Sequence, residues 1–283
     1  RHGHFGRAAD ACGISQPALS VQIKELEALL SAPLTERSAR QIRLSSLGET
    51  FARRAREILR SVDELNDLVR AESGVLTGRL RIGIIPTIAP YLLPGLIREL
   101  GAQSPDLDIL PREAVTQTLI RDLNEGRLDM AVVALPVSEP ALHEEVLFDE
   151  EFVLVRPRAD ADKPVPDAEQ LREMRLLLLE EGHCFRNQAL SFCKPSTLAA
   201  RDMMEGCSLS TLVRMVGSNI GVTLIPEMAV PTETRLADVS VERLPSPRPT
   251  RTVGMVWRKS SPLAPQWAEI ARTLQGCGRD RLI

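Results

Sequence analysis

The stretch from residue 47 to residue 73 constrains the fold of this 283-residue chain more than any other feature. It holds no proline and a single glycine, so little in it interrupts a helix. Its apolar side chains recur at alternating steps of four and three residues, at Phe51, Ala55, Ile58, Val62, Leu65 and Val69. Such a repeat is typical of the seam of a left-handed coiled coil. We therefore predict a linker helix over residues 47–74 that dimerises; an amphipathic helix packed on its own domain is the alternative.

The segment before this helix is basic. Residues 1–60 carry ten Lys and Arg against six Asp and Glu, although the whole chain has a net charge of −3. A basic end on an acidic chain is typical of a module that faces phosphates. An ordinary solvated surface is the alternative, since the excess is modest.

Residues 1–46 have the pattern of a winged helix-turn-helix. A helix over residues 5–11 is predicted to end at Gly13, and Ser15 is a candidate N-cap for a second helix with Pro17 in its first turn. Apolar side chains at helical spacing predict the buried face of this second helix: Leu19, Ile23, Leu26, Leu29 and Leu30. Residues 33–37 and 40–44 predict a two-stranded wing.

The exposed face of the second helix carries small or hydrogen-bonding side chains that suit base edges and phosphates in a major groove. The predicted DNA contacts are Ser15, Gln16, Pro17, Ala18, Ser20, Gln22 and Lys24. Arg37, Arg40 and Arg43 of the wing are expected to reach backbone phosphates. A small helical hairpin of another function, with exposed basic residues, remains the alternative from the pattern alone.

The remaining chain predicts a two-lobed α/β body. Strands near residues 80–85, 107–113 and 129–135 alternate with helices near 90–100 and 116–124, which indicates a parallel sheet. Residues 75–147 with 260–283 form the first predicted lobe, and residues 148–259 form the second. Ligands of such sheets bind outside the carboxyl ends of the strands, so Thr87 and Thr116 are expected to face one crevice.

Two of the five cysteines, Cys184 and Cys193, lie in the segment with the most chemistry. Cys184 is expected to follow a strand and begin a helix, where backbone N–H groups, His183 and Arg186 would favour the nucleophilic thiolate. In one continuous helix the two cysteines would lie ~13 Å apart along the axis, whereas a disulfide needs Cα atoms within ~7 Å. Two unrelated cysteines are the alternative on spacing alone. Cys12 and Cys207 are expected to pack as small apolar residues, and Cys277 to lie near a frayed end.

The N-terminal segment resembles the winged helix-turn-helix of LysR-type regulators. The residues that carry the resemblance are Ala8-Ala9-Asp10, Ser15 to Ser20, Ile23 to Glu27, Leu34 to Arg37 and Leu44 to Gly48. The resemblance implies a DNA-binding regulator that dimerises through its linker helix, with a periplasmic-binding-protein-like body. It also places a further helix before Phe5, so that a chain beginning at Arg1 is expected to bind its operator weakly.

The cysteine segment resembles the peroxide-sensing OxyR branch of the same family. The matching residues are Gly182-His183-Cys184, Arg186, Gln188-Ala189 and Phe192-Cys193. The resemblance implies that Cys184 is the peroxidatic and Cys193 the resolving cysteine, and that Thr87, Thr116 and His183 hold the peroxide. Arg186 is expected to take part in binding the peroxide as well. Asn187 departs from the pattern, because better-known relatives carry an acidic residue there, and this places the rate of oxidation in doubt.

Together these features predict a transcriptional regulator rather than an enzyme, with no cofactor and no metal. The expected partners are double-stranded promoter DNA, RNA polymerase, further copies of the chain in a homodimer or homotetramer, and hydrogen peroxide as the signal. A cytoplasmic location is expected because the sequence has no apolar run of ~20 residues and no signal-peptide pattern. The alternatives are a LysR-type regulator with a small-molecule effector, and a thiol peroxidase.

Overall fold

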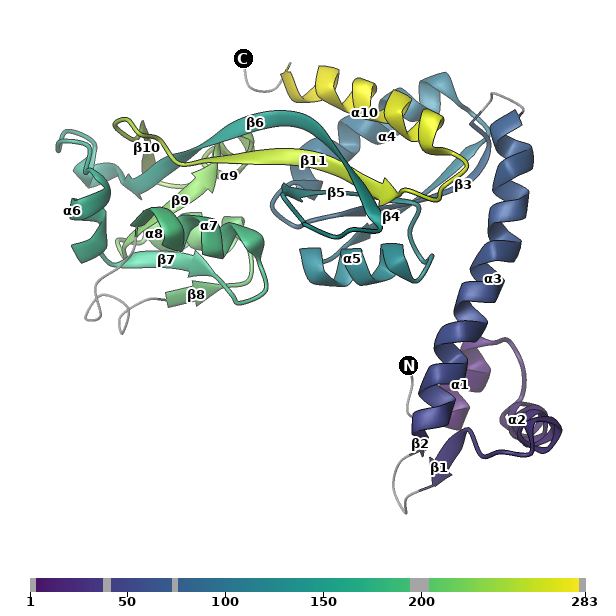
Figure 1. Cartoon of the computed structure of the whole chain (residues 1–283). Helices are drawn as coiled ribbons and strands as arrows, with labels where there is room; N and C mark the ends of the chain where they lie inside the picture. Colours follow the sequence, from purple (N-terminus) through teal and green to yellow (C-terminus); the bar gives the residue numbers. More distant parts are fainter. Residues whose placement is uncertain (1–3, 38–41, 73–75, 194–203, 280–283) are drawn as a thin grey trace. The chain divides into compact units, whose positions relative to one another are not determined.

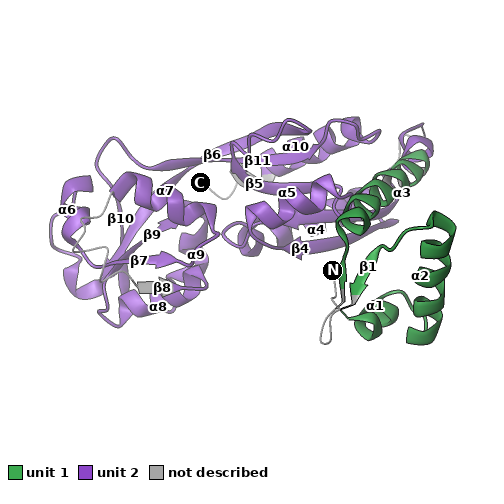
Figure 2. Ribbon diagram, turned by 60° about the horizontal axis from the view of Figure 1, so that its bottom comes forward, with its two compact units in different colours: residues 1–65 green, residues 66–283 purple. Residues whose placement is uncertain are grey.

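The computed structural model describes residues 4–37, 42–72, 76–193 and 204–279. The chain forms two compact units, residues 1–65 and residues 66–283 (Figure 2). Each unit has its own arrangement of secondary structure, and the boundary falls inside the long helix that the sequence predicted.

The N-terminal unit is a winged helix-turn-helix, as predicted. It contains α1 (Phe5–Ala11), α2 (Gln16–Leu30), the antiparallel strands β1 (Thr35–Arg37) and β2 (Ile42–Leu44), and the first part of α3 (Ser46–Glu72). Gly13 has a φ of 66°, and the Ser15 side chain caps α2 by accepting a hydrogen bond from the Ala18 N–H. Glu27 joins α2 to the wing, because its carboxylate accepts from the backbone N–H groups of Leu34 and Thr35.

The apolar face of α2 is less buried than predicted. Leu19, Ile23 and Leu26 are half-buried, but Leu29 is 83% and Leu30 38% exposed. At 100° per residue, Leu29 points about 80° away from Leu19 around the helix axis. Leu30 lies in the last turn of the helix. The prediction that both leucines are buried is therefore wrong for the chain as it stands.

The first lobe of the C-terminal unit is the predicted βαβαβ arrangement. Its elements are β3 (Gly78–Ile84), α4 (Ala89–Gln103), β4 (Leu107–Glu113), α5 (Thr116–Asn124) and β5 (Met130–Leu135). β3 pairs in parallel with both β4 and β5. The C-terminal helix α10 (Ala264–Arg279) packs on α4 of this lobe (Figure 1).

The second lobe contains α6 (Ala168–Glu173), β7 (Leu176–Leu179), α7 (Cys184–Cys193), α8 (Leu209–Gly217) and β9 (Val222–Pro226). Cys184 follows a strand and begins a helix, as predicted. Three short elements were outside the predictions, namely β8 (Met204–Gly206), α9 (Val230–Glu233) and β10 (Val239–Arg243).

Two long strands run through both lobes (Figure 1). β6 (Leu142–Pro157) and β11 (Thr250–Arg258) pair antiparallel with each other, and β11 also pairs with β5 of the first lobe. The sheet order is β4-β3-β5-β11-β6-β9-β7-β8, with β10 also paired to β6. The predicted bounds of the second lobe, residues 148–259, placed all of β11 in that lobe. In the structure the two lobes share this strand.

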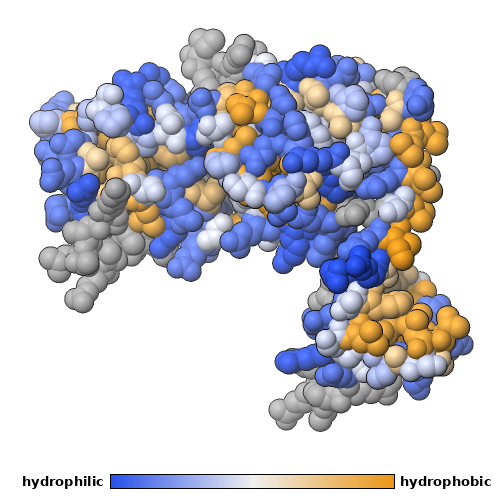
Figure 3. Space-filling model, viewed as in Figure 1, coloured by the Kyte–Doolittle hydropathy of each residue, from blue (hydrophilic) through white to orange (hydrophobic). Residues whose placement is uncertain are grey.

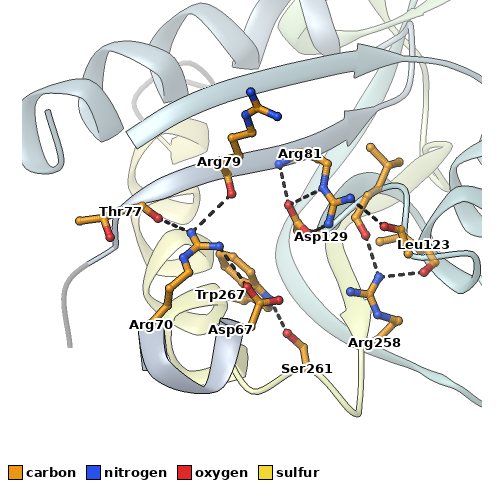
Figure 4. A network of polar contacts seen from close by, with 12 residues as sticks. Asp67, Arg70, Thr77, Arg79, Arg81, Leu123, Asp129, Arg258, Ser261 and Trp267 are labelled. Carbon is orange, nitrogen blue, oxygen red and sulfur yellow. Dashed lines mark hydrogen bonds and ion pairs between the residues drawn. The ribbon is translucent and has the colours of Figure 1, made fainter. Parts of the chain in front are cut away.

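Polar contacts hold the C-terminal end of α3 and the first lobe together (Figure 4). Arg70 of α3 pairs with Asp67 at 3.1 Å and donates to the Thr77 carbonyl at the start of the first lobe. Beside it, Arg81 pairs with the nearly buried Asp129 at 2.6 Å. These contacts anchor the last turn of α3 to the start of the first lobe.

Candidate functional site

Helix α7 begins at one cysteine and ends at the other. Cys184 follows β7 after a four-residue turn in which Gly182 has a φ of 97°. The helix is continuous over its 10 residues, so the thiols are separated by ~13 Å of axial rise. Cys184 and Cys193 are both free thiols. The structure therefore shows a reduced form in which these two cysteines cannot bond without unfolding the helix between them.

A narrow pocket surrounds the Cys184 end of α7. It is lined by Ile85, Pro86, Thr87, Val115, Thr116, His183, Cys184 and Phe185. The predicted crevice thus exists, because the strand ends of β3 and β4 bring both threonines to the thiol. The side chains that line the pocket are tightly packed and leave no room for a molecule the size of water, so a peroxide can enter only when these side chains move apart.

Two hydroxyl groups in this pocket differ in their hydrogen bonding. Thr87 is 2% exposed, and its Oγ1 accepts a hydrogen bond from Arg251 Nη1 at 2.8 Å. That acceptance leaves the Thr87 hydroxyl proton available for donation to another group. Thr116 Oγ1 is buried and has no partner among the described residues. A buried polar atom without a partner is costly, so this hydroxyl fits a small polar ligand in the pocket.

A buried ion pair supports the pocket, and the sequence reasoning missed it. Arg251 of β11 and Glu150 of β6 are opposite each other in the strand register, and both side chains are fully buried at 2.8 Å. Glu150 also accepts from the Met228 N–H, and the Arg251 guanidinium lies 6.0 Å from the Phe185 ring centre. β6 also carries Glu144, Glu145, Asp149 and Glu151, so no local signal distinguishes Glu150, and only the register of β6 and β11 shows the pair.

His183 and Arg186 flank Cys184 but have different roles from those expected on charge alone. Burial lowers the pKa of His183, which favours the neutral imidazole at pH 7. Arg186 donates from Nη1 to the Leu179 carbonyl at 3.0 Å. It is not among the residues that line the pocket, so its part in binding peroxide stays a prediction.

The Cys193 end of α7 is apolar. Cys193 is fully buried, and this burial raises the pKa of its thiol to about 11. Phe185 and Ala189 are buried along the same helix, and the Phe185 ring packs edge-on against Phe152 at 4.8 Å. The second thiol is thus protonated and inaccessible while α7 is folded.

The expectation that Cys12 and Cys207 are packed is wrong. Both are exposed, because Cys12 is the C-cap of α1 at the surface and Cys207 lies in the connection between β8 and α8. The side chain of Cys277 lies outside the described residues.

Most of the side chains that were predicted to contact DNA, at and after the start of α2, are exposed. Ser15, Gln16, Pro17, Gln22 and Lys24 are exposed, whereas Ala18 and Ser20 are half-buried. Arg37 is placed at the end of β1, but its side chain and all of Arg40 lie outside what the structure describes.

The predicted seam of α3 is exposed in the single chain (Figure 3). Ile58, Val62, Leu65 and Val69 are between 53% and 73% exposed. Leu59 and Leu68 widen this apolar stripe at 64% and 51%. Phe51 and Ala55, nearer the start of the helix, are half-buried.

The described residues contain neither a candidate membrane-spanning helix nor a candidate metal-binding cluster. No helix among them has the length and apolar character to cross a membrane. No group of three or more His, Cys, Asp or Glu side chains in the same part of the chain could hold a metal ion.

Comparison with known proteins extends over nearly the whole chain. Residues 1–49 match the bacterial regulatory helix-turn-helix of the lysR family, and residues 73–276 match the LysR substrate binding domain. A probable hydrogen peroxide-inducible genes activator of Streptomyces viridosporus is 40% identical over 99% of this chain and 91% of its own length. The DNA-binding transcriptional dual regulator OxyR of Escherichia coli is 38% identical, over 97% and 90%.

The solved structures that resemble this chain belong to the same family as these relatives. A full-length OxyR variant from Pseudomonas aeruginosa has a TM-score of 0.77 at 36% identity, covering 96% of this chain and 90% of its own. A peroxide-bound OxyR variant from Corynebacterium glutamicum has a TM-score of 0.71 at 32% identity, with coverages of 99% and 89%. The helix-turn-helix, the two-lobed body and these likenesses show that the chain belongs to the LysR family of transcriptional regulators, in its OxyR branch.

Proposed function

We propose that this regulator senses hydrogen peroxide through Cys184 and converts the signal into a Cys184–Cys193 disulfide. The observation that carries the proposal is the pocket in which Cys184 meets Thr87, His183 and the unpartnered hydroxyl of Thr116. The names of the relatives, which are hydrogen peroxide-inducible genes activators, point to the same signal and to activation of transcription.

The first chemical step is oxidation of Cys184. Its thiolate attacks one peroxide oxygen, an S–O bond forms and the O–O bond breaks, so that sulfur is oxidised and peroxide reduced. The departing hydroxide takes up a proton and leaves as water. Thr87, held by Arg251 with its proton free to donate, and Thr116 are suited to stabilise the negative charge on that oxygen.

The second step joins the two ends of α7. The Cys193 thiolate attacks the sulfenic sulfur of Cys184, the disulfide forms, and the hydroxyl of the sulfenic acid leaves as water after protonation. Because α7 separates the thiols by ~13 Å, the helix must unfold before this step. Unfolding removes Phe185 from Phe152 and changes the packing of the second lobe, which supplies the conformational switch.

The output of the switch is DNA binding by a pair of chains. The exposed face of α2 suits a major groove, and the exposed stripe of α3 suits a parallel or antiparallel partner helix from a second copy. We infer a homodimer at least. We infer contact with RNA polymerase from the proposed activation of transcription, and not from a particular surface of this chain. A DNA-binding function supports the expected cytoplasmic location.

Peptide mapping tests the redox steps. Reduced protein receives one equivalent of hydrogen peroxide, its remaining thiols are alkylated, and disulfides are mapped by mass spectrometry. We expect a Cys184–Cys193 bond in the wild type and none in Cys184→Ser, whereas Cys12→Ser behaves as wild type. Protein in which peroxide leaves Cys184 as a free thiol would contradict the proposal.

Sedimentation tests the dimer. Leu65→Asp places a charge in the exposed stripe of α3 and is expected to shift the assembly toward monomers, with weaker binding of promoter DNA. Arg53→Asp, at an exposed position on the opposite side of the same helix, is the matched control for adding an acidic charge. Equal dissociation by both variants would show that the stripe is not the interface.

A second candidate function is control by a small-molecule effector. A larger pocket, with a cavity volume of ≈ 110 Å³, adjoins the thiol pocket and contains the polar groups of Tyr91, Ser210 and Glu233. Tight binding of a metabolite there, together with DNA binding that peroxide does not change, would favour this candidate.

A further inference from the structure

Cys207 is an exposed thiol that the two-cysteine switch leaves unused. It lies immediately after β8 and before Ser208, the N-cap of α8. Its side chain lines the larger pocket together with Pro86, Thr87 and His183, and these three residues also line the narrow pocket that holds Cys184. The two thiols therefore face adjoining spaces that have one wall in common.

The sheet topology brings the same two cysteines together independently of the pockets. β7 and β8 are adjacent parallel strands with Leu179 opposite Gly206, and the Glu180 N–H donates to the Gly206 carbonyl at 3.1 Å. Carboxyl ends of parallel strands lie at the same edge, with neighbouring strands ~4.8 Å apart. Cys207 thus leaves the sheet beside Glu180, only a short turn before Cys184.

Cys193 is less accessible to Cys184 than Cys207 is. Those two cysteines are held ~13 Å apart by α7, and Cys193 is fully buried. Cys207 is exposed, and no helix separates its strand end from that of Cys184. A sulfenic acid at Cys184 therefore has an accessible thiol nearby before α7 unfolds.

We propose that Cys207 is a second resolving thiol for Cys184. This inference rests on the proposed oxidation of Cys184 by peroxide. The Cys207 thiolate attacks the sulfenic sulfur, an S–S bond forms, the S–O bond breaks, and the hydroxyl leaves as water after protonation. The product links the ends of β7 and β8 and leaves α7 folded, so it is an oxidised state that does not switch. Competition between Cys207 and Cys193 then sets the fraction of oxidised chains that respond.

The full chain with Cys193→Ser isolates the proposed reaction. The protein receives one equivalent of hydrogen peroxide and is then alkylated and mapped without reduction. We expect a Cys184–Cys207 disulfide within one chain in the larger part of the oxidised protein. Trapping with a sulfenic-acid reagent is expected to show that the sulfenic acid at Cys184 decays at least tenfold faster than in the Cys193→Ser, Cys207→Ser double variant. Cys193→Ser combined with Cys12→Ser is the matched control and keeps the fast decay.

Three outcomes would overturn the inference, and they are distinguishable. Sulfenic or sulfinic acid at Cys184 with Cys207 recovered as an alkylated thiol rejects Cys207 while sparing peroxide sensing. A Cys207 disulfide that forms only between chains, with a yield that rises with protein concentration, also rejects it. Cys184 recovered as an unoxidised thiol rejects the inference together with the proposed function on which it rests.

Discussion

The two ends of α7 carry the same functional group in opposite surroundings. Cys184 lies in a pocket with two threonine hydroxyls and an imidazole, whereas Cys193 is fully buried among apolar side chains, and this burial raises its pKa to about 11. One helix thus holds one accessible and one inaccessible thiol. The surroundings of each thiol, and not the residue type, therefore determine which cysteine an oxidant reaches first. The second cysteine can react only after α7 unfolds.

The largest effect is expected at the buried ion pair behind the Cys184 end. Arg251→Met leaves the Glu150 carboxylate buried without its partner, so the free energy of unfolding should fall by about 3–5 kcal/mol. Urea denaturation of the reduced protein measures this. Arg251→Met with Glu150→Met should recover much of the loss, because it removes the unpaired charge as well. A double variant no more stable than the single one would show that the pair does not act as a unit.

The next effect concerns the hydroxyl that has no partner in the pocket. Thr116→Val keeps the side-chain shape and is expected to slow oxidation of Cys184 by peroxide about 10²-fold, the usual cost of one donor to a developing oxyanion. Stopped-flow measurement of the rate against peroxide concentration tests this. Thr118→Val, on the same helix but outside the pocket, is the control. Equal rates for both variants would remove Thr116 from the site.

The Cys193 end predicts a pH dependence of stability. Because the folded pKa is about 11 and the reference value 9.0, the unfolded chain ionises first as pH rises. Stability from the neutral thiol is therefore full below pH 9 and is lost between about pH 9 and 11, by about 2–3 kcal/mol. Urea unfolding at pH 8.5 and 10.5 should show this loss in wild type and a smaller one in Cys193→Ala. Identical pH dependences would mean that Cys193 is not the group responsible.

The smallest effect is expected midway along α7. Gln188 has a buried Oε1 with no partner among the described residues, so Gln188→Leu should stabilise the reduced protein by up to about 1 kcal/mol. A more stable α7 unfolds less often, and formation of the Cys184–Cys193 disulfide should slow about fivefold, because 1 kcal/mol is that factor in an equilibrium. The rate of Cys184 oxidation should not change. Ser191→Ala, on the same helix, is the control. If Gln188→Leu slowed oxidation of Cys184 as much as disulfide formation, its effect would not come from the folding of α7.

Local sequence determined most of the elements of this protein. The helix-turn-helix, the long helix α3, and the β3, β4 and β5 strands were predicted because helix caps, turn glycines and apolar periodicity act within a few residues. The threonines of the pocket could be placed near each other because parallel strands end at one edge of a sheet. The pairing of Cys184 with Cys193 came from resemblance to a family and remains a prediction.

Tertiary structure alone decided the rest, because burial and pairing are set by residues distant in the chain. Glu150 and Arg251 meet only through the register of β6 and β11, about one hundred positions apart. Cys207 was expected in the core from its apolar neighbours, yet the parallel pairing of β7 with β8 places it at an exposed strand end beside the redox pocket. A sequence shows which side chains can react, but the packing of distant segments determines which of them are accessible and what lies within their reach.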